Sequence, residues 1–517
     1  MNISTSPVAA PKSVIYNPDP KDLRSIVGAM PNARKTEFDN YNVETRVVAR
    51  SKGSTFIATD TPEQHTDQTM SRREADAIAK RQDDYIRGQE MVLIDGYIGC
   101  DPSYRVPARL MIERRNANVA AMQQQLYFTP GAGDWAHFEP QVHVIYTPNL
   151  PAHGYPNDRV IAVDLEHNVT RVLNSDYFGE SKKGGLRMWN RLVYDWGGLP
   201  MHAGCKSIPV DGRHKIGLII GLSGTGKTTT TFSQQNGSMP LQDDFVGLFP
   251  GGKVIATEDG CFAKTYGLSE QSEPEIYRAV TSPTAYLENV SQDGRGHVNF
   301  HDDSYTQNGR ATFPFYLIPN AGDVHTIDRV DFVLILNRNE NIIPAVARLT
   351  QEQAAAYFML GETKGTSAGG AEEAGKALRV PGTNPFFPLR HGLQGTRFLE
   401  LLRTLPQLQV YLMNTGWVGG PEGTRHNRKI KIAHSSAIVQ AIAEETISWE
   451  HDSTFGYEVA TAVPGIDDER LLQPRLIYEH TGRRDEYARI VQQLKRERLA
   501  HLKKYPALTE EIVQAAG

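Results

Sequence analysis

The chain has 517 residues, enough for two to four ordinary domains or for two large ones. It is 39% hydrophobic and 22% charged, as globular proteins are, and its formal net charge of −5 does not favour a nucleic-acid-binding protein. Its three cysteines form no CxxC pair, which argues against a disulfide framework or a structural zinc module. The opening segment lacks the regions of a signal peptide, and no apolar run could span a bilayer. We therefore expect a soluble, cytoplasmic protein that acts on small molecules.

The first 200 residues predict a domain that mixes helices and strands. Residues 71–90 read as an exposed, charge-laced helix, and residues 116–127 have a helical composition. Short runs of β-forming residues predict strands at 91–94, 109–112, 141–146 and 159–165. The pattern indicates an α/β first domain that ends near Pro200.

The rest of the chain predicts a second region with many short strands, at 215–220, 253–257, 330–337, 342–346 and 408–413. Helical and loop material lies between residues 351 and 405 and includes a glycine-rich run. Residues 485–504 form an amphipathic helix pattern, whose basic far side we interpret as a solvated surface and not as a nucleic-acid-binding face.

The strongest motif fits the G-x-x-x-x-G-K-[ST] pattern of a phosphate-binding loop and consists of Gly221, Leu222, Ser223, Gly224, Thr225, Gly226, Lys227 and Thr228. Its glycines let backbone N–H groups point at phosphate oxygens, Lys227 binds the β- and γ-phosphates, and Thr228 ligates Mg²⁺. Four consecutive threonines follow the lysine. Because β-branched residues are poor helix formers, we expect the helix after this loop to be short or to be supported by tertiary contacts.

A pair of acidic residues, Asp243 and Asp244, follows the loop in the sequence MPLQDDF. Two adjacent carboxylates can both contribute to a metal site, one as a direct ligand and the other through a metal-bound water molecule. Taken alone, an Asp-Asp pair is equally typical of a turn cap. The pair therefore indicates a metal site only in combination with the loop.

In combination, these motifs resemble the ATP-dependent phosphoenolpyruvate carboxykinases. The resemblance spans residues 43 to 475, and the phosphate-binding loop lacks the cysteine of the GTP-dependent relatives. The further segments that carry it are YFGESKKG (177–184), MH (201–202), EDGCFAKT (258–265), SEPEIY (272–277), LENV (287–290), NGRATFP (308–314), ARLT (347–350) and NTGW (414–417).

The resemblance implies a two-domain α/β fold, with an N-terminal α/β domain (1–200) and a C-terminal mononucleotide-binding domain (201–517) that contains the phosphate-binding loop. It implies an active site in the cleft between them. The implied activity is that of a lyase of gluconeogenesis, which converts oxaloacetate and ATP to phosphoenolpyruvate, CO₂ and ADP with Mn²⁺ and Mg²⁺. Small residues are dense in 361–385, where we expect a lid that excludes water.

The resemblance also implies roles for individual residues. The Mn²⁺ ligands would be Lys183, as a neutral amine, with His202 and Asp244, while Asp243 would lie near the Mg²⁺ that Thr228 ligates. The residues implied in substrate binding are Arg50, Tyr177, Lys182, Lys183 and Arg310, the last of which bridges the transferring phosphoryl group. Beyond the loop, the implied ATP-binding positions are Lys264, Glu273, Arg310, Lys429 and Ser435.

The chain departs from the family pattern at several places, two of which concern the expected substrate and nucleotide sites. Family members usually read GRSPKDK at the substrate arginine, whereas this chain reads ARSKGST around Arg50, and Lys429 stands where an arginine is expected. These departures leave two alternatives open: an ATP-dependent phosphotransferase that acts on another small oxo- or hydroxy-acid, and a nucleotide-binding regulatory protein without turnover. The sequence leaves open whether the chain is a monomer or a small homo-oligomer.

Overall fold

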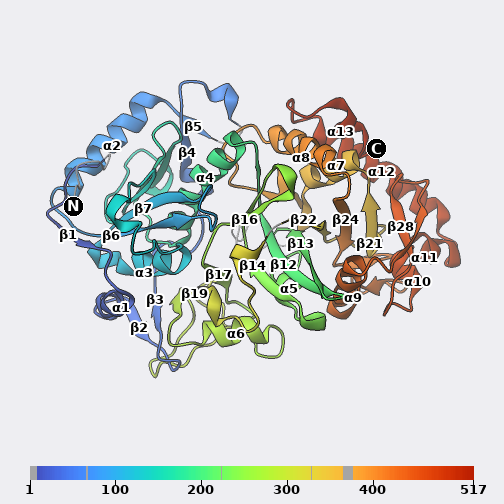
Figure 1. The fold of residues 1–517 in the computed structure, drawn as a ribbon, viewed down its shortest axis with the longest axis horizontal. Helices are drawn as coiled ribbons and strands as arrows, with labels where there is room; N and C mark the ends of the chain where they lie inside the picture. Colours follow the sequence, from blue (N-terminus) through green and yellow to red (C-terminus); the bar gives the residue numbers. More distant parts are fainter. Residues whose placement is uncertain (1–7, 66–67, 223, 328, 365–376) are drawn as a thin grey trace. The chain divides into compact units, whose positions relative to one another are not determined.

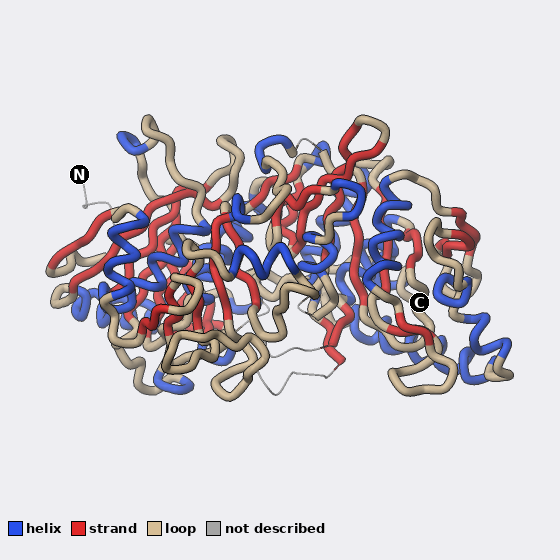
Figure 2. The backbone as a smooth tube through the Cα atoms, turned by 90° about the horizontal axis from the view of Figure 1, so that it is seen from below, coloured by secondary structure: helices blue, strands red, loops and turns tan. Residues whose placement is uncertain are grey.

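The computed structural model describes residues 8–65, 68–222, 224–327, 329–364 and 377–517. The backbone contains both helices and strands throughout its described length (Figure 2). The chain divides into two compact units, one formed by the described residues of Met1–Leu192 and Thr257–Pro319. The other is formed by those of Val193–Ala256, Asn320–Thr366 and Ala371–Gly517. Helices and strands in both units agree with an α/β fold. About half of the residues expected to form a lid, namely 365–376, lie outside the described ranges, so the lid stays a prediction.

The larger sheet of the first unit has eight strands in the order β1-β6-β7-β8-β10-β9-β4-β5. Its paired strands β6 and β7 lie side by side in Figure 1. Neighbouring strands of this sheet are partly parallel and partly antiparallel. The pairs β7–β8 and β8–β10 are parallel, whereas the pairs β6–β7 and β9–β10 are antiparallel. The strands are β1 (Ser13–Tyr16), β4 (Thr55–Ala58), β5 (Thr69–Met70), β6 (Glu90–Ile98), β7 (Val106–Glu113), β8 (Val142–Thr147), β9 (Val160–Asp164) and β10 (Val169–Leu173).

A five-stranded sheet, in the order β17-β19-β18-β3-β2, completes the first unit. Its strands are β2 (Ala33–Lys35), β3 (Tyr41–Val43), β17 (Gly260–Lys264), β18 (Tyr286–Glu288) and β19 (Arg310–Pro314). This sheet is the reason that residues 257–319 group with the first unit, because β18 pairs with β3. The unit's helices are α1 (Pro20–Gly28), α2 (Arg72–Ile86), α3 (Ala117–Leu126), α4 (Gly179–Asp195), whose last three residues are assigned to the second unit, and α6 (Pro274–Val280).

The second unit is built on an eight-stranded sheet in the order β14-β12-β13-β20-β24-β21-β28-β27. Its centre is parallel, because β13 pairs with β20 and β20 with β24 in the same direction. The strands are β12 (Ala203–Val210), β13 (Arg213–Ile220), β14 (Met239–Gln242), β20 (Phe332–Asn337), β21 (Val346–Leu349), β24 (Gln409–Asn414), β27 (Ser448–His451) and β28 (Glu458–Ala462).

Smaller sheets and eight helices accompany this sheet among the described residues. The smaller sheets consist of β11 (Leu199–Met201), β15 (Val246–Leu248) and β16 (Val254–Ala256), of β22 (Glu362–Lys364) with β23 (Ala377–Arg379), and of β25 (Trp417–Val418) with β26 (Arg428–Lys429). The helices are α5 (Lys227–Phe232), α7 (Gln351–Leu360), α8 (Gly392–Thr404), α9 (Ile432–Ala443), α10 (Glu469–Leu472), α11 (Arg475–His480), α12 (Arg484–Leu502) and α13 (Glu510–Gln514). No helix in the described ranges combines the length and apolarity that crossing a membrane requires.

Most elements expected from the sequence are present, and local chemistry explains their ends. The charge-laced helix is confirmed as α2, which begins after a capping box in which Ser71 and Glu74 each bond the other's backbone N–H. A strand expected at 342–346 is wrong, since the strand there begins only at Val346. Ile342 and Ile343 are instead buried in an irregular segment whose Ile343 carbonyl accepts from Asn414 Nδ2. These two residues are apolar because they are buried, and not because they form a strand.

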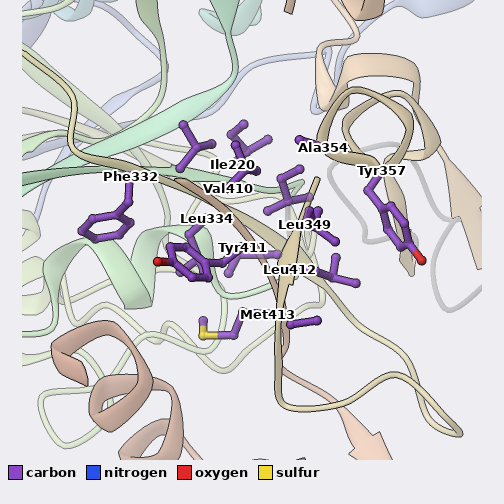
Figure 3. Packing of buried hydrophobic residues seen from close by; sticks show 14 of the residues in the cluster. Ile220, Phe332, Leu334, Leu349, Ala354, Tyr357, Val410, Tyr411, Leu412 and Met413 are labelled. Carbon is purple, nitrogen blue, oxygen red and sulfur yellow. The ribbon is translucent and has the colours of Figure 1, made fainter. Parts of the chain in front are cut away.

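The core of the second unit lies between the central sheet and the helices that cover it. Figure 3 shows Ile220, Leu334, Val410 and Leu412 packed together from neighbouring strands, near Ala354 of α7. The parallel strands are almost entirely apolar, as expected for strands buried on both faces. This rigid platform carries the phosphate-binding loop at the end of β13.

Candidate active site

The phosphate-binding loop follows β13 directly and leads into α5. Gly224 and Gly226 have φ angles of 87° and 92°, a backbone region that side chains strongly disfavour. A Cβ at Gly221 would lie 2.4 Å from Thr225 Oγ1, which donates a 2.7 Å hydrogen bond to the Leu222 carbonyl. The glycines of the motif are therefore required by this conformation. Ser223 lies outside the described residues.

Residues at the ends of the two neighbouring parallel strands hold this loop. Arg338, just after β20, donates a 2.7 Å hydrogen bond to the Gly224 carbonyl. Thr415, just after β24, donates from Oγ1 to the Thr225 carbonyl at 2.7 Å. The carboxyl ends of adjacent parallel strands are where α/β sheets place ligands, so the loop occupies the expected position for a nucleotide site.

Lys227, the motif lysine, is buried at the start of α5 and contacts the acidic pair. Its Nζ donates to Asp244 Oδ1 at 2.6 Å and to the Asp243 carbonyl at 3.1 Å. The same Asp244 oxygen lies 2.9 Å from His202 Nε2. The fold thus brings together the phosphate-binding lysine and two of the three expected Mn²⁺ ligands.

His202 has the geometry of a neutral metal-binding imidazole. Its Nδ1 lies 2.9 Å from the Thr383 carbonyl, which can only accept, so the proton of the neutral ring belongs on Nδ1. Burial and the charge of Lys227 lower the pKa of His202, although Asp244 acts in the opposite direction. The Nε2 lone pair then faces a carboxylate oxygen, and two acceptors in contact favour a cation between them. These two residues therefore fit a divalent metal.

In the first unit, the two adjacent lysines of α4 have different environments. Lys182 Nζ donates to Glu258 Oε2 at 2.9 Å, and both side chains are buried. Burial lowers the pKa of Lys183 to about 7, with further lowering from the charges of Arg50, Arg187 and Arg310 and opposition from Glu180. A lysine can ligate a metal only as the neutral amine. The environment of Lys183 therefore suits the role that the resemblance implies.

Arg310 is oriented by Asn308 and lies in a positively charged cluster. Asn308 Oδ1 accepts from Arg310 Nε at 3.1 Å and from Nη2 at 2.8 Å, and Asn308 Nδ2 donates to the Tyr177 hydroxyl at 3.2 Å. Lys264 is the cross-strand partner of Arg310 in the β17–β19 pair. Burial, together with the charge of Arg310, lowers the pKa of Lys264 to about 8. Cations this close together are typical of an anion-binding site.

Arg50 lies in the altered loop, which a buried carboxylate anchors. Glu180 Oε1 accepts a 2.7 Å hydrogen bond from the backbone N–H of Ser51. The Nε of Arg50 is buried and, among the described residues, makes no hydrogen bond. A buried guanidinium nitrogen without a partner carries a desolvation cost that an anionic ligand would relieve.

The remaining expected ATP-binding residues lie at three places. Glu273 directly precedes α6 in the first unit. Lys429 is exposed on β26, with its Nζ 5.6 Å from the centre of the Trp417 ring. Ser435 is buried in the first turn of α9. In the second unit, then, β26 and α9 hold two of these positions close together in the chain.

The sequence alone assigns no role to several residues that the structure places around these groups, namely Glu180, Glu258, Asn308, Arg338 and Thr415. All of them except Arg338 lie inside the motif segments that carry the family resemblance. Those segments were therefore the signal by which these four residues could have been found from the sequence. Among the described residues, no group of three His, Cys, Asp or Glu side chains could hold a metal ion. The expected Mn²⁺ ligands do not form such a group, because one of the three is a lysine.

Comparison with known proteins identifies the family. The profile of the phosphoenolpyruvate carboxykinase family matches residues 12–469. Phosphoenolpyruvate carboxykinase (ATP) 1 of Moorella thermoacetica is 31% identical over 485 residues, which cover 90% of each chain. The ATP enzyme of Geobacillus kaustophilus is 32% identical over 79% of this chain and 77% of its own, and that of Brevibacillus brevis 33% over 75% and 73%. The chain therefore belongs to the ATP-dependent phosphoenolpyruvate carboxykinase family.

Proposed function

We propose that this chain converts oxaloacetate and ATP to phosphoenolpyruvate, CO₂ and ADP, a reaction of gluconeogenesis. The observation that carries the proposal is the family match over residues 12–469, which includes the phosphate-binding loop and both lysines of α4. The cytoplasmic location expected from the sequence stays a prediction.

In this proposal the second unit is the mononucleotide-binding domain. The loop from Gly221 to Lys227 binds the ATP phosphates through backbone N–H groups and the lysine. Thr228, with Asp243, would hold the Mg²⁺ of the nucleotide, while Lys429 and Ser435 contribute to the nucleoside site. The structure supports the proposal because neighbouring strand ends fix the loop through Arg338 and Thr415.

The substrate-binding residues belong to the first unit, where Arg50, Tyr177, Lys182 and Arg310 are proposed to bind oxaloacetate and the transferring phosphoryl group. Lys264 and Glu273, from the same unit, are proposed for ATP. The support is the positive charge of the arginines near these lysines, because Arg310 lowers the pKa of both Lys183 and Lys264. Their charge suits a dicarboxylate and a triphosphate.

Lys183 of the first unit, and His202 and Asp244 of the second, are each proposed as Mn²⁺ ligands. The lowered pKa values of Lys183 and His202 keep both nitrogens available as neutral donors. When bound, the two divalent metals supply positive charge that offsets the charge of the phosphates and of the enolate.

The chemistry requires two coupled bond exchanges. The C–C bond to the departing carboxylate of oxaloacetate breaks, and its electron pair becomes the enolate of pyruvate. The enolate oxygen then attacks the γ-phosphorus of ATP as the bond to the ADP oxygen breaks. Arg310 and Lys227 contribute fixed positive charge at the phosphoryl group. Electrostatic stabilisation of this kind, together with positioning of the substrates, accounts for most of the catalysis of phosphoryl transfer.

The direct test is an assay of the purified chain with oxaloacetate, ATP, Mg²⁺ and Mn²⁺, in which phosphoenolpyruvate is detected by ³¹P NMR. We expect product well above that of a Lys227→Ala control, and product no greater than the control would refute the proposal. A parallel panel of oxo- and hydroxy-acids separates the alternatives. ADP formation with another acid alone would indicate a different acceptor, and ATP binding without any turnover would indicate a regulatory protein.

A further inference from the structure

Lys206 is a fully buried lysine on β12 to which the proposed function assigns no role. Its side chain is 0% exposed. Its Nζ donates to the Thr230 carbonyl at 2.9 Å, to the Ser233 carbonyl, and to Ser233 Oγ at 3.3 Å. Burial lowers the pKa of Lys206 to about 7, and the amine directs its N–H groups at these three oxygens, so the lysine is hydrogen-bonded within the interior.

The oxygens that Lys206 contacts belong to the C-terminal end of α5, the helix that begins with Lys227. That helix is only six residues long, which confirms the expectation from its four threonines. Because the last four carbonyls of any helix lack intrahelical partners, most of α5 depends on groups outside the helix. An N–H donor at a helix C-terminus satisfies these carbonyls, and in its protonated form a lysine there also interacts favourably with the helix dipole.

A second contact packs helix α5 against strand β12. Gly204 lies two residues before Lys206, and a Cβ at Gly204 would lie 2.1 Å from Thr231 Oγ1. Thr231 Oγ1 also donates to the Lys227 carbonyl at 2.9 Å. Strand β12 thus approaches α5 closely at Thr231 and binds the C-terminal end of the helix.

We propose that Lys206 is a positioning residue for ATP binding, which holds the C-terminal end of α5 so that Lys227 and Thr228 at its other end stay in place for the phosphates. A longer phosphate-loop helix would keep its position through further turns packed on the sheet. Here the lysine takes the place of those turns. The inference rests on the proposed binding of ATP at this loop.

The experiment compares Lys206→Met, which removes the donors but preserves length, with Ser207→Ala as a matched control. Ser207 is the next residue of β12 and is also buried, but it bonds His214 Nδ1, away from α5. We expect Lys206→Met to raise the Kd for MgATP and the KM for ATP at least tenfold and to leave the KM for oxaloacetate within twofold. We expect Ser207→Ala to change neither constant by more than twofold.

A milder variant covers the case in which Lys206→Met does not fold. Ser233→Ala removes one of the three acceptors, and we expect a two- to fivefold rise in the Kd for MgATP. An unchanged Kd in the folded Lys206→Met protein, or in Ser233→Ala when Lys206→Met does not fold, would overturn the inference. An equal rise in Ser207→Ala would also overturn it. If the wild-type chain binds MgATP but forms no phosphoenolpyruvate, the proposed function fails while the Kd comparison still decides the role of Lys206.

Discussion

The carboxylate of Glu180 accepts a 2.7 Å hydrogen bond from the backbone N–H of Ser51, the residue that follows the proposed substrate arginine. Glu180 is 1% exposed and lies in the first turn of α4, three residues before Lys183 and therefore on the same side of the helix. One buried carboxylate thus connects the altered Arg50 loop to the helix that carries both lysines. This contact offers the loop an anchor where the usual proline and aspartate of the family are missing.

We predict that Glu180→Ala impairs oxaloacetate binding more than ATP binding, because the variant frees the Arg50 loop. The KM for oxaloacetate should rise about tenfold or more, as expected for loss of a buried charge-assisted hydrogen bond of about 1.5–3 kcal/mol. Steady-state kinetics with each substrate varied would measure this. Glu180→Gln retains an acceptor for Ser51 and should show a smaller rise. Equal changes in both KM values would contradict the prediction.

Removal of the Lys183 amine should weaken Mn²⁺ binding. We predict that Lys183→Met, which is similar in length but has no donor, lowers Mn²⁺ affinity at least tenfold and abolishes phosphoenolpyruvate formation. Titration of Mn²⁺ followed by electron paramagnetic resonance would give the affinity without any turnover. Lys182→Met is the matched control on the adjacent position, since Lys182 bonds Glu258, and its Mn²⁺ affinity should stay near that of the wild type. A wild-type affinity in Lys183→Met would remove this residue from the metal site.

Arg498 should be important for stability although it lies in α12, the amphipathic helix whose basic side the sequence led us to interpret as solvated. Its side chain is 0% exposed and donates to both carboxylate oxygens of Glu362, at 3.1 and 2.8 Å. We predict that Arg498→Met costs about 3–5 kcal/mol, because it leaves a largely buried carboxylate short of its main partner. Denaturant unfolding would measure the loss. Arg498→Met combined with Glu362→Leu should recover much of it, and a double variant no better than the single one would refute this explanation.

The same ion pair should contribute to stability in acid. Burial alone would raise the pKa of Glu362, but the charges and hydrogen bonds of Arg498 and Arg379 hold it at about 2, against 4.5 in an unfolded chain. A depressed native pKa stabilises the fold fully above pH 4.5, and this contribution is lost as the pH falls from there through 2. It amounts to about 3 kcal/mol at most. Acid titrations followed by circular dichroism should show a weaker pH dependence between 4.5 and 2 in Glu362→Gln than in the wild type, and identical slopes would argue against it.

The sequence predicted much of this protein because many of its signals are local. Glycines at fixed spacing, a strand before them and β-branched residues after them predict a phosphate-binding loop with a short helix, and the structure contains both. Family membership could likewise be inferred from short segments in order, and the comparisons confirm it.

The tertiary structure decided which residues support those segments, since their partners are distant in the chain. Glu180 and Ser51 are 129 residues apart, and Arg498 and Glu362 are 136 apart, so no spacing rule relates them. Pairing of β18 with β3 also joins residues 257–319 to the first unit, a grouping that depends on the sheet. Lys206 in the sequence is one of many lysines, and only burial against the end of α5 distinguishes it. Local sequence determines turns, caps and periodicity, whereas burial and long-range hydrogen bonds exist only once the chain has folded.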